Sequence, residues 1–141
     1  WQGAYSAFMR WRQEIARIAG LPPLDLMEGF YSPGDFNDIV KYARLGLSSN
    51  TAFEPIARSL PIRWNVLRPD PALYFLLNHS DCDGVIPPDI CQRLADRLEE
   101  LLPLFPSGDG GGHIGNWRDK TATFIAGLRL AAERNEPVEF H

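Results

Sequence analysis

Apolar residues recur at helical spacing in several stretches of the chain, which predicts a mainly helical protein. The first stretch covers residues 6–19 and is followed by Gly20, a residue type that often ends a helix. Its apolar face contains Phe8, Trp11, Ile15 and Ile18. We expect this helix to pack against the core along that face.

The remaining periodic stretches predict further helices over residues 35–46, 51–59, 71–78, 88–102 and 117–136, with at most a helical turn at 24–30. Pro71 and Pro88 stand at first helical positions, and Asn116 is a residue type that caps a helix N-terminus. No strand-like run exceeds a few residues, although residues 138–141 can be extended. The predicted fold is all-α: a compact bundle of five or six helices, formed by one domain over residues 1–141.

Composition narrows the class of protein without changing this fold. The 141 residues are 45% hydrophobic and 23% charged, which is ordinary for one globular domain. A formal net charge of −4 disfavours nucleic acid or an anionic membrane as the main partner. No apolar run approaches the roughly 18–20 residues that span a bilayer. Two cysteines fit a reducing compartment, so we expect a soluble cytoplasmic protein.

One loop carries candidate chemistry, and it lies between the predicted helices 71–78 and 88–102. With Gly84 as the sixth position, it is similar to a degenerate EF-hand or dockerin calcium loop. Asp81 and Asp83 then supply the third and fifth ligands, and Val85 supplies a backbone carbonyl at the seventh. This spacing makes Ca²⁺ the first candidate cofactor and predicts an EF-hand-like helix–loop–helix.

The loop also departs from a calcium loop at three positions. His79 replaces the first acid, Pro87 occupies the ninth position, and Ile90 occupies the twelfth, where a bidentate acid is expected. The candidate ligand set is therefore Asp81, Asp83, Val85, His79 and Asp89. The favoured interpretation is a structural turn whose two inner aspartates accept backbone N–H bonds and cap the next helix. A weak cation site is the alternative.

Cysteine and histidine positions leave two further alternatives open. His79 and Cys82 have metal-ligand spacing, and Cys91, His113 or His141 could complete a Zn²⁺ site, which makes zinc the second candidate cofactor. A redox pair of Cys82 and Cys91 requires close Cα atoms and an exposed thiol.

Two residue clusters favour structural roles. The aromatic residues Trp1, Tyr5, Phe8 and Trp11 are interleaved with Arg10 and Arg12, which is typical of a core edge whose arginines reach solvent. The charged run at residues 93–100 is typical of a solvated helix face.

Three blocks of the chain together resemble a group of uncharacterised bacterial single-domain proteins. The blocks are the LLNHSDCDG segment at 76–84, Tyr5-Ser6-x-Phe8 with Trp11-Arg12, and the closing residues 137–141. The resemblance implies a bacterial, cytoplasmic protein and supplies no catalytic residues. It also suggests that the middle loop and the carboxyl end belong to one site, since Phe140 is expected to pack and to bring the imidazole of His141 back to the surface of the domain.

The pattern favours a non-enzymatic helical domain that binds a protein partner, and no residue is predicted to be catalytic or to bind an organic cofactor. The alternative is a metal-dependent hydrolase built on His79, Asp81 and Asp83, with His113 or His141.

Overall fold

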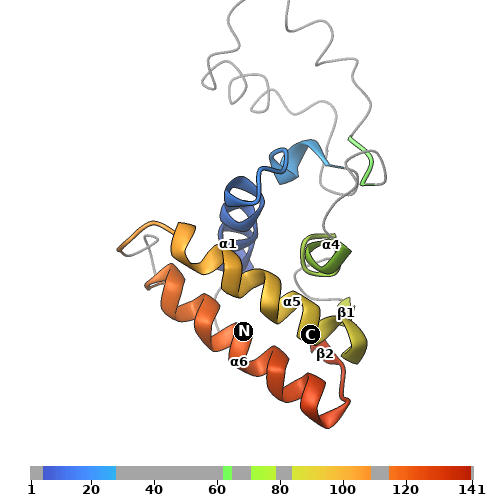
Figure 1. Ribbon diagram of the computed structural model, residues 1–141. Helices are drawn as coiled ribbons and strands as arrows, with labels where there is room; N and C mark the ends of the chain where they lie inside the picture. Colours follow the sequence, from blue (N-terminus) through green and yellow to red (C-terminus); the bar gives the residue numbers. More distant parts are fainter. Residues whose placement is uncertain (1–4, 28–61, 65–70, 79–83, 109–114, 141) are drawn as a thin grey trace, which may run out of the picture.

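A computed structural model describes residues 5–27, 62–64, 71–78, 84–108 and 115–140 (Figure 1). Within these ranges the chain is mostly helical. The α-helices are α1 (Tyr5–Ile18), α4 (Pro71–Leu77), α5 (Pro88–Leu101) and α6 (Trp117–Arg134). Two short 3₁₀ turns, η1 (Leu24–Leu26) and η2 (Leu102–Leu104), and two strands, β1 (Gly84–Ile86) and β2 (Val138–Phe140), complete the described part.

The four predicted helices that fall within the described ranges are confirmed, with ends within two residues of the predicted ones. The predicted helices at 35–46 and 51–59 lie outside the described residues, so the total of five or six helices stays a prediction. The same holds for the EF-hand geometry, because residues 79–83 also lie outside.

Helix ends follow the capping residues that the sequence contains. Gly20 adopts a left-handed φ of 72°, and the backbone N–H of Leu21 reaches back to Ala16 O at 2.9 Å. At the start of α6, Asn116 accepts a hydrogen bond from the backbone N–H of Arg118 at 2.9 Å. At its end, Asn135 turns left-handed with a φ of 53°. These caps fix where the chain leaves each helix.

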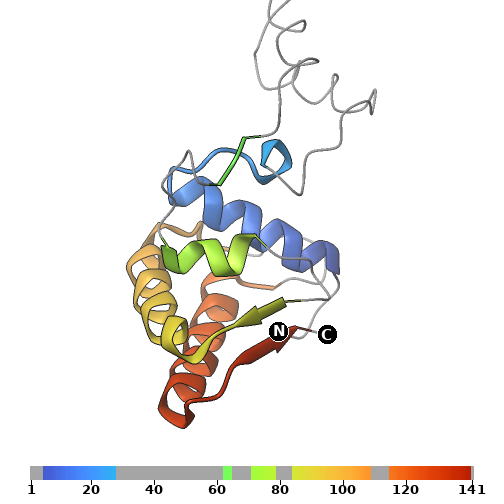
Figure 2. The ribbon, with the colours of Figure 1, turned by 90° about the vertical axis from the view of Figure 1, so that its right-hand side faces the viewer.

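The all-α expectation misses a small antiparallel sheet (Figure 2). β1 pairs with β2 in a register that sets Gly84 opposite Phe140 and Ile86 opposite Val138. The predicted extended segment near the carboxyl end is confirmed as β2. β1 has only three residues, and the sequence predicts a loop for them. So short a strand shows no recognisable alternation of polar and apolar residues, and it forms only when its partner strand is present.

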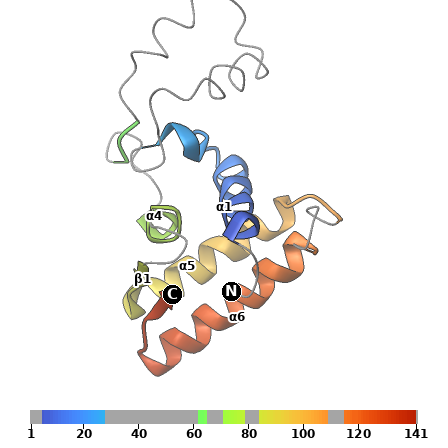
Figure 3. The same cartoon turned by 180° about the vertical axis from the view of Figure 1, so that it is seen from behind.

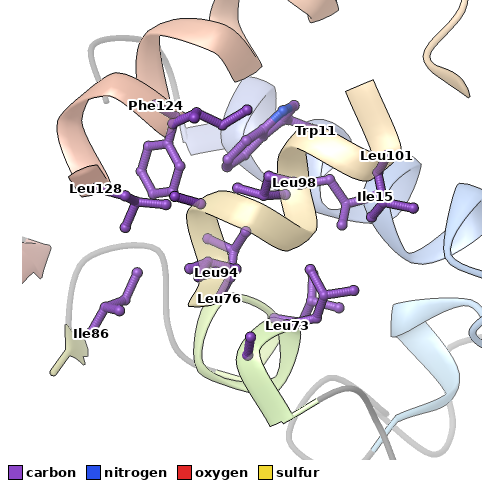
Figure 4. Packing of buried hydrophobic residues seen from close by; sticks show 14 of the residues in the cluster. Trp11, Ile15, Leu73, Leu76, Ile86, Leu94, Leu98, Leu101, Phe124 and Leu128 are labelled. Atoms are coloured by element: carbon purple, nitrogen blue, oxygen red, sulfur yellow. The ribbon is translucent and has the colours of Figure 1, made fainter. Parts of the chain in front are cut away.

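α5 and α6 lie side by side and run antiparallel, and they share the most extensive contact of the described part (Figures 1 and 3). α1 and α4 lie across one side of this pair (Figure 2). The side chains that meet at the centre are shown in Figure 4, and the buried ones include Ile15, Leu73, Leu76, Leu94, Leu98 and Leu128. One cluster of buried residues therefore joins all four helices.

Four aromatic rings connect the two ends of the chain. Trp11 lies 5.0 Å from Phe124, and Phe8 lies 5.5 Å from Phe140, measured between ring centroids. Trp11 Nε1 also donates a 2.9 Å hydrogen bond to the hydroxyl of Thr121, which in turn donates to the carbonyl of Trp117. The buried indole therefore has its polar atom satisfied, and α1 is fixed against α6.

Arg12 corrects the expectation for the arginines of the aromatic cluster. Arg10 is exposed as predicted, but Arg12 is fully buried, with its guanidinium 4.8 Å from the centre of the Phe8 ring. A guanidinium is weakly hydrated and can stack on an aromatic face, so its burial here is physically reasonable.

Candidate functional site

The structure describes only the carboxyl-terminal flank of the candidate cation-binding loop, from Gly84 onward. His79, Asp81 and Asp83 lie outside the described residues. Val85 lies in β1 with its side chain 52% exposed, and Asp89 is exposed in the first turn of α5. Within the described ranges, no three His, Cys, Asp or Glu side chains gather in a way that could hold a metal ion. The cation site therefore stays a prediction for the loop itself.

Cys91 behaves as a packing residue. It is a free thiol that is fully buried, and its Sγ lies 3.7 Å from the carbonyl oxygen of Ile86. Burial raises the pKa of the Cys91 thiol, which disfavours the thiolate needed for zinc ligation or thiol exchange. Cys82, His113 and His141 lie outside the described residues, so a zinc site or a redox pair gains no support from Cys91.

The expected meeting of the middle loop and the carboxyl end at one site involves residues 79–83 and His141, which lie outside the described residues, but the strands next to them are described. β1 and β2 are hydrogen-bonded neighbours, and Phe140 packs against Phe8 and Phe124. The strand pairing and these ring contacts hold β2 against the hydrophobic core. They do not test whether a binding site exists there, and that part stays a prediction.

A different surface stands out once the helices are placed. α6 buries one face, including Phe124 and Leu128, and the opposite face is exposed. Between positions 122 and 130 this face exposes one charged residue, Arg129, which reaches across to Glu99 of α5. The other exposed residues are small or apolar, and we call them the α6 outer face: Ala122, Thr123, Ala126, Gly127 and Leu130. Leu130 is 45% exposed and is one of three large exposed hydrophobic residues in the described part.

A groove of about 640 Å³ runs along the edge of the α6 outer face. Phe124, Leu128 and Val138 supply its apolar lining, so the groove lies between α6 and β2. Its polar lining comes from Asn116, which caps α6, and from Asp119, Lys120 and Thr123 in the first half of the helix. A groove of this size with an apolar lining and a few polar groups can hold a side chain or a small ligand.

Gly127 lies both on the α6 outer face and in the groove. A Cβ atom added at this position would meet no atom within 4 Å, and its φ is not left-handed. Neither packing nor backbone geometry within the described residues therefore requires glycine. Glycine in a helix interior costs about 1 kcal/mol relative to alanine. Its effect here is to leave the helix backbone open to a close neighbour.

Helical periodicity predicted the helix α6 but gave no signal for its outer face. The signal was present in the charge pattern, since residues 121–128 contain no charged residue. A helix segment with apolar or small residues on every face is usually buried on every face. That segment is open on one side in the described part of the chain.

Comparisons with protein-family models, with curated proteins and with solved structures gave no match. The resemblance to bacterial single-domain proteins therefore stays a prediction. None of the described helices has the length and apolar character needed to cross a membrane.

Proposed function

We propose that this chain acts as a non-enzymatic, protein-binding domain and that the α6 outer face is its binding surface. A single observation carries the proposal: α6 exposes Ala126 and Gly127 beside a groove with an apolar lining, in a stretch without charge between Lys120 and Arg129, and it exposes Leu130 directly after that stretch. The buried centre of an interface between proteins is depleted of charged residues and is more apolar than the rest of the surface.

Energetics support a protein partner for this surface. Each buried apolar Å² contributes about 25 cal/mol, so covering Leu130 and the groove walls is favourable. The backbone at Gly127 lets a partner helix approach closely. A rigid helix, fixed to α1 through the Trp11 to Thr121 hydrogen bond, presents this surface in one conformation, which reduces the entropy lost on binding.

Site-specific photo-crosslinking in cells that produce the protein tests the proposal. One variant carries a photo-crosslinking amino acid in place of Leu130, and the matched control carries it in place of Leu104, which is also apolar and 57% exposed. We expect protein adducts at position 130 and not at position 104. Adding Ala126→Arg to the first variant should abolish them, because a charge at the centre of the contact must be desolvated.

No adduct at position 130, or equal labelling at both positions, would contradict the proposal. Equal labelling would mean that crosslinking reports only exposure. Because both leucines are exposed, neither substitution is expected to change the free energy of unfolding by more than about 0.5 kcal/mol.

A further inference from the structure

We infer that the partner of the α6 outer face is a second copy of this chain, with the two α6 helices packed antiparallel. The inference rests on the proposed function and names its partner. Three features of α6 carry it: the spacing of its exposed residues, the size of the residues at the centre, and the placement of charge at the ends.

The exposed residues along one stripe of α6 alternate in spacing between four and three positions: Asp119, Thr123, Ala126, Leu130 and Glu133. This spacing keeps a single stripe of one helix in contact with a second, nearly aligned helix. The three central residues are small or apolar, so two such stripes can approach to the roughly 8–10 Å between axes that packed helices show. The stripe therefore has the form of a helix–helix seam with an apolar centre.

Charge selects the antiparallel direction. In a parallel pair, Asp119 would face Asp119 of the partner subunit, and Glu133 would face Glu133 of the partner subunit. Both pairs bring like charges together at the two ends of the seam. Two parallel copies of α6 would therefore repel each other at both ends of the seam.

An antiparallel pair centred between Phe124 and Ile125 removes both conflicts. It sets Thr123 opposite Ala126 of the partner subunit and Asp119 opposite Leu130 of the partner subunit. Asp119 then lies beside Arg129 of the partner subunit, and two-fold symmetry repeats this contact at the other end. Arg129 already contacts Glu99 Oε2 at 2.5 Å and Asp96 Oδ1 at 3.7 Å, and a guanidinium has five N–H donors for several carboxylates.

The contact area predicts how tightly the copies associate. α6 has 18 residues and is about 27 Å long. One helix pair of this length buries less than the roughly 1,200 Å² typical of stable complexes. We therefore expect a weak, reversible dimer that forms over micromolar concentrations.

Analytical ultracentrifugation of the purified full chain, from low micromolar to near-millimolar concentration, tests the inference. We expect a concentration-dependent equilibrium between monomer and dimer. Ala126→Arg and Thr123→Arg should each leave only monomer, while Gln92→Arg on the exposed face of α5 should leave the equilibrium unchanged. Circular dichroism and thermal unfolding establish that each variant is folded, as expected for substitutions at exposed positions.

A charge exchange tests the antiparallel register. Asp119→Arg alone should weaken dimerisation by about tenfold, because it places two cations together at both ends of the seam. Combining Asp119→Arg with Arg129→Asp should restore the dissociation constant to within about threefold of the reference protein. The reference and both variants carry Asp96→Asn and Glu99→Gln, because an acid at position 129 would otherwise face these two carboxylates of its own chain. A double variant that is no better than Asp119→Arg alone would overturn the register.

The two proposals fail in different ways. A monomer at every concentration, combined with adducts to another protein at position 130, would overturn the second copy as partner and leave the binding face standing. A dimer that persists in Ala126→Arg would place self-association on another surface and would also overturn this inference. The absence of adducts at position 130 in cells would overturn the proposed function itself.

Discussion

α5 and α6 are neighbours that bury similar apolar faces, yet their exposed faces differ sharply. The exposed side of α5 is polar at every position, with Gln92, Arg93, Asp96, Glu99 and Glu100. Its side chains also bond to one another, as in the 2.7 Å contact between Arg97 and Glu100. The exposed centre of α6 contains small or apolar residues apart from Arg129, which pairs with α5. The expected solvated face at residues 93–100 is confirmed, and it serves as an internal reference for α6.

This difference separates what folds the domain from what remains available to a partner. Both helices meet the core through leucines at helical spacing, so either outer face would be compatible with the fold. A charged face resists desolvation, since each charge would lose its hydration in a contact. A small, apolar face loses little when covered. α6 therefore presents a surface that can be covered, and α5 presents one that stays in water.

The largest expected effect distinguishes the two faces of α6 through two leucines only two positions apart. Leu128→Ala should lower the free energy of unfolding by about 2–5 kcal/mol, because the side chain is buried and its loss leaves a cavity. Leu130→Ala should change it by no more than about 0.5 kcal/mol. Denaturant unfolding at low protein concentration measures both.

Leu130→Ala should nevertheless weaken self-association, which ultracentrifugation of the same samples would reveal. If Leu130→Ala were as destabilising as Leu128→Ala, the outer face would belong to the core of the domain. The contrast between α5 and α6 would then have no bearing on binding.

Gly127→Ala should have an effect of intermediate size: it should stabilise the monomer and weaken the dimer. Alanine should raise the free energy of unfolding of the monomer by about 0.5–1 kcal/mol, because its Cβ enters open space and restricts the unfolded chain. The added methyl group should also hold a partner helix further away and weaken the dimer. Thermal unfolding and ultracentrifugation measure the two effects, with Gln92→Gly on the exposed face of α5 as a control that should lower stability and leave self-association unchanged.

A gain in stability with unchanged self-association would place Gly127 outside the contact. A loss of stability would mean that the position is already covered within the chain.

The smallest expected effect concerns the ion pairs that join the two helices. Arg129→Ala should lower the free energy of unfolding of the monomer by about 0.2–1 kcal/mol, since its pairs with Glu99 and Asp96 are exposed. The loss should disappear in 1 M salt, where screening acts over about 3 Å. Arg134→Ala is the matched control, and an equal loss in both variants would exclude a specific link between α5 and α6.

Local signals in the sequence were sufficient to predict the described helices. Gly20, Asn116 and Pro88 each act on the backbone within a few residues, so their positions predict helix ends directly. The pairing of β1 with β2 depends instead on residues more than 50 positions apart. No local pattern reports such a contact. Chemistry drew attention to the loop at 79–83, whereas the outer face of α6 has no reactive group. Its uncharged stretch at residues 121–128 is a signal in the sequence, but that stretch indicates a surface only when its exposure is known.

The burial of Arg12 also could not be predicted from the neighbouring residues in the sequence. The residue lies between buried Trp11 and half-buried Gln13, and helical spacing alone does not indicate which side of Trp11 the core covers. The stacking of its guanidinium on Phe8 requires the neighbouring elements to be in place.

The four-ring cluster of Phe8, Trp11, Phe124 and Phe140 has a consequence for synthesis of the chain on the ribosome. At roughly 5–20 residues per second, Phe140 follows Trp11 after roughly 6–26 s. Throughout that interval the rings of α1 lack the partners that cover them in the finished domain. The nascent chain is therefore an expected client for chaperones that bind exposed aromatic segments, and α1 can complete its packing only after β2 has emerged from the ribosome.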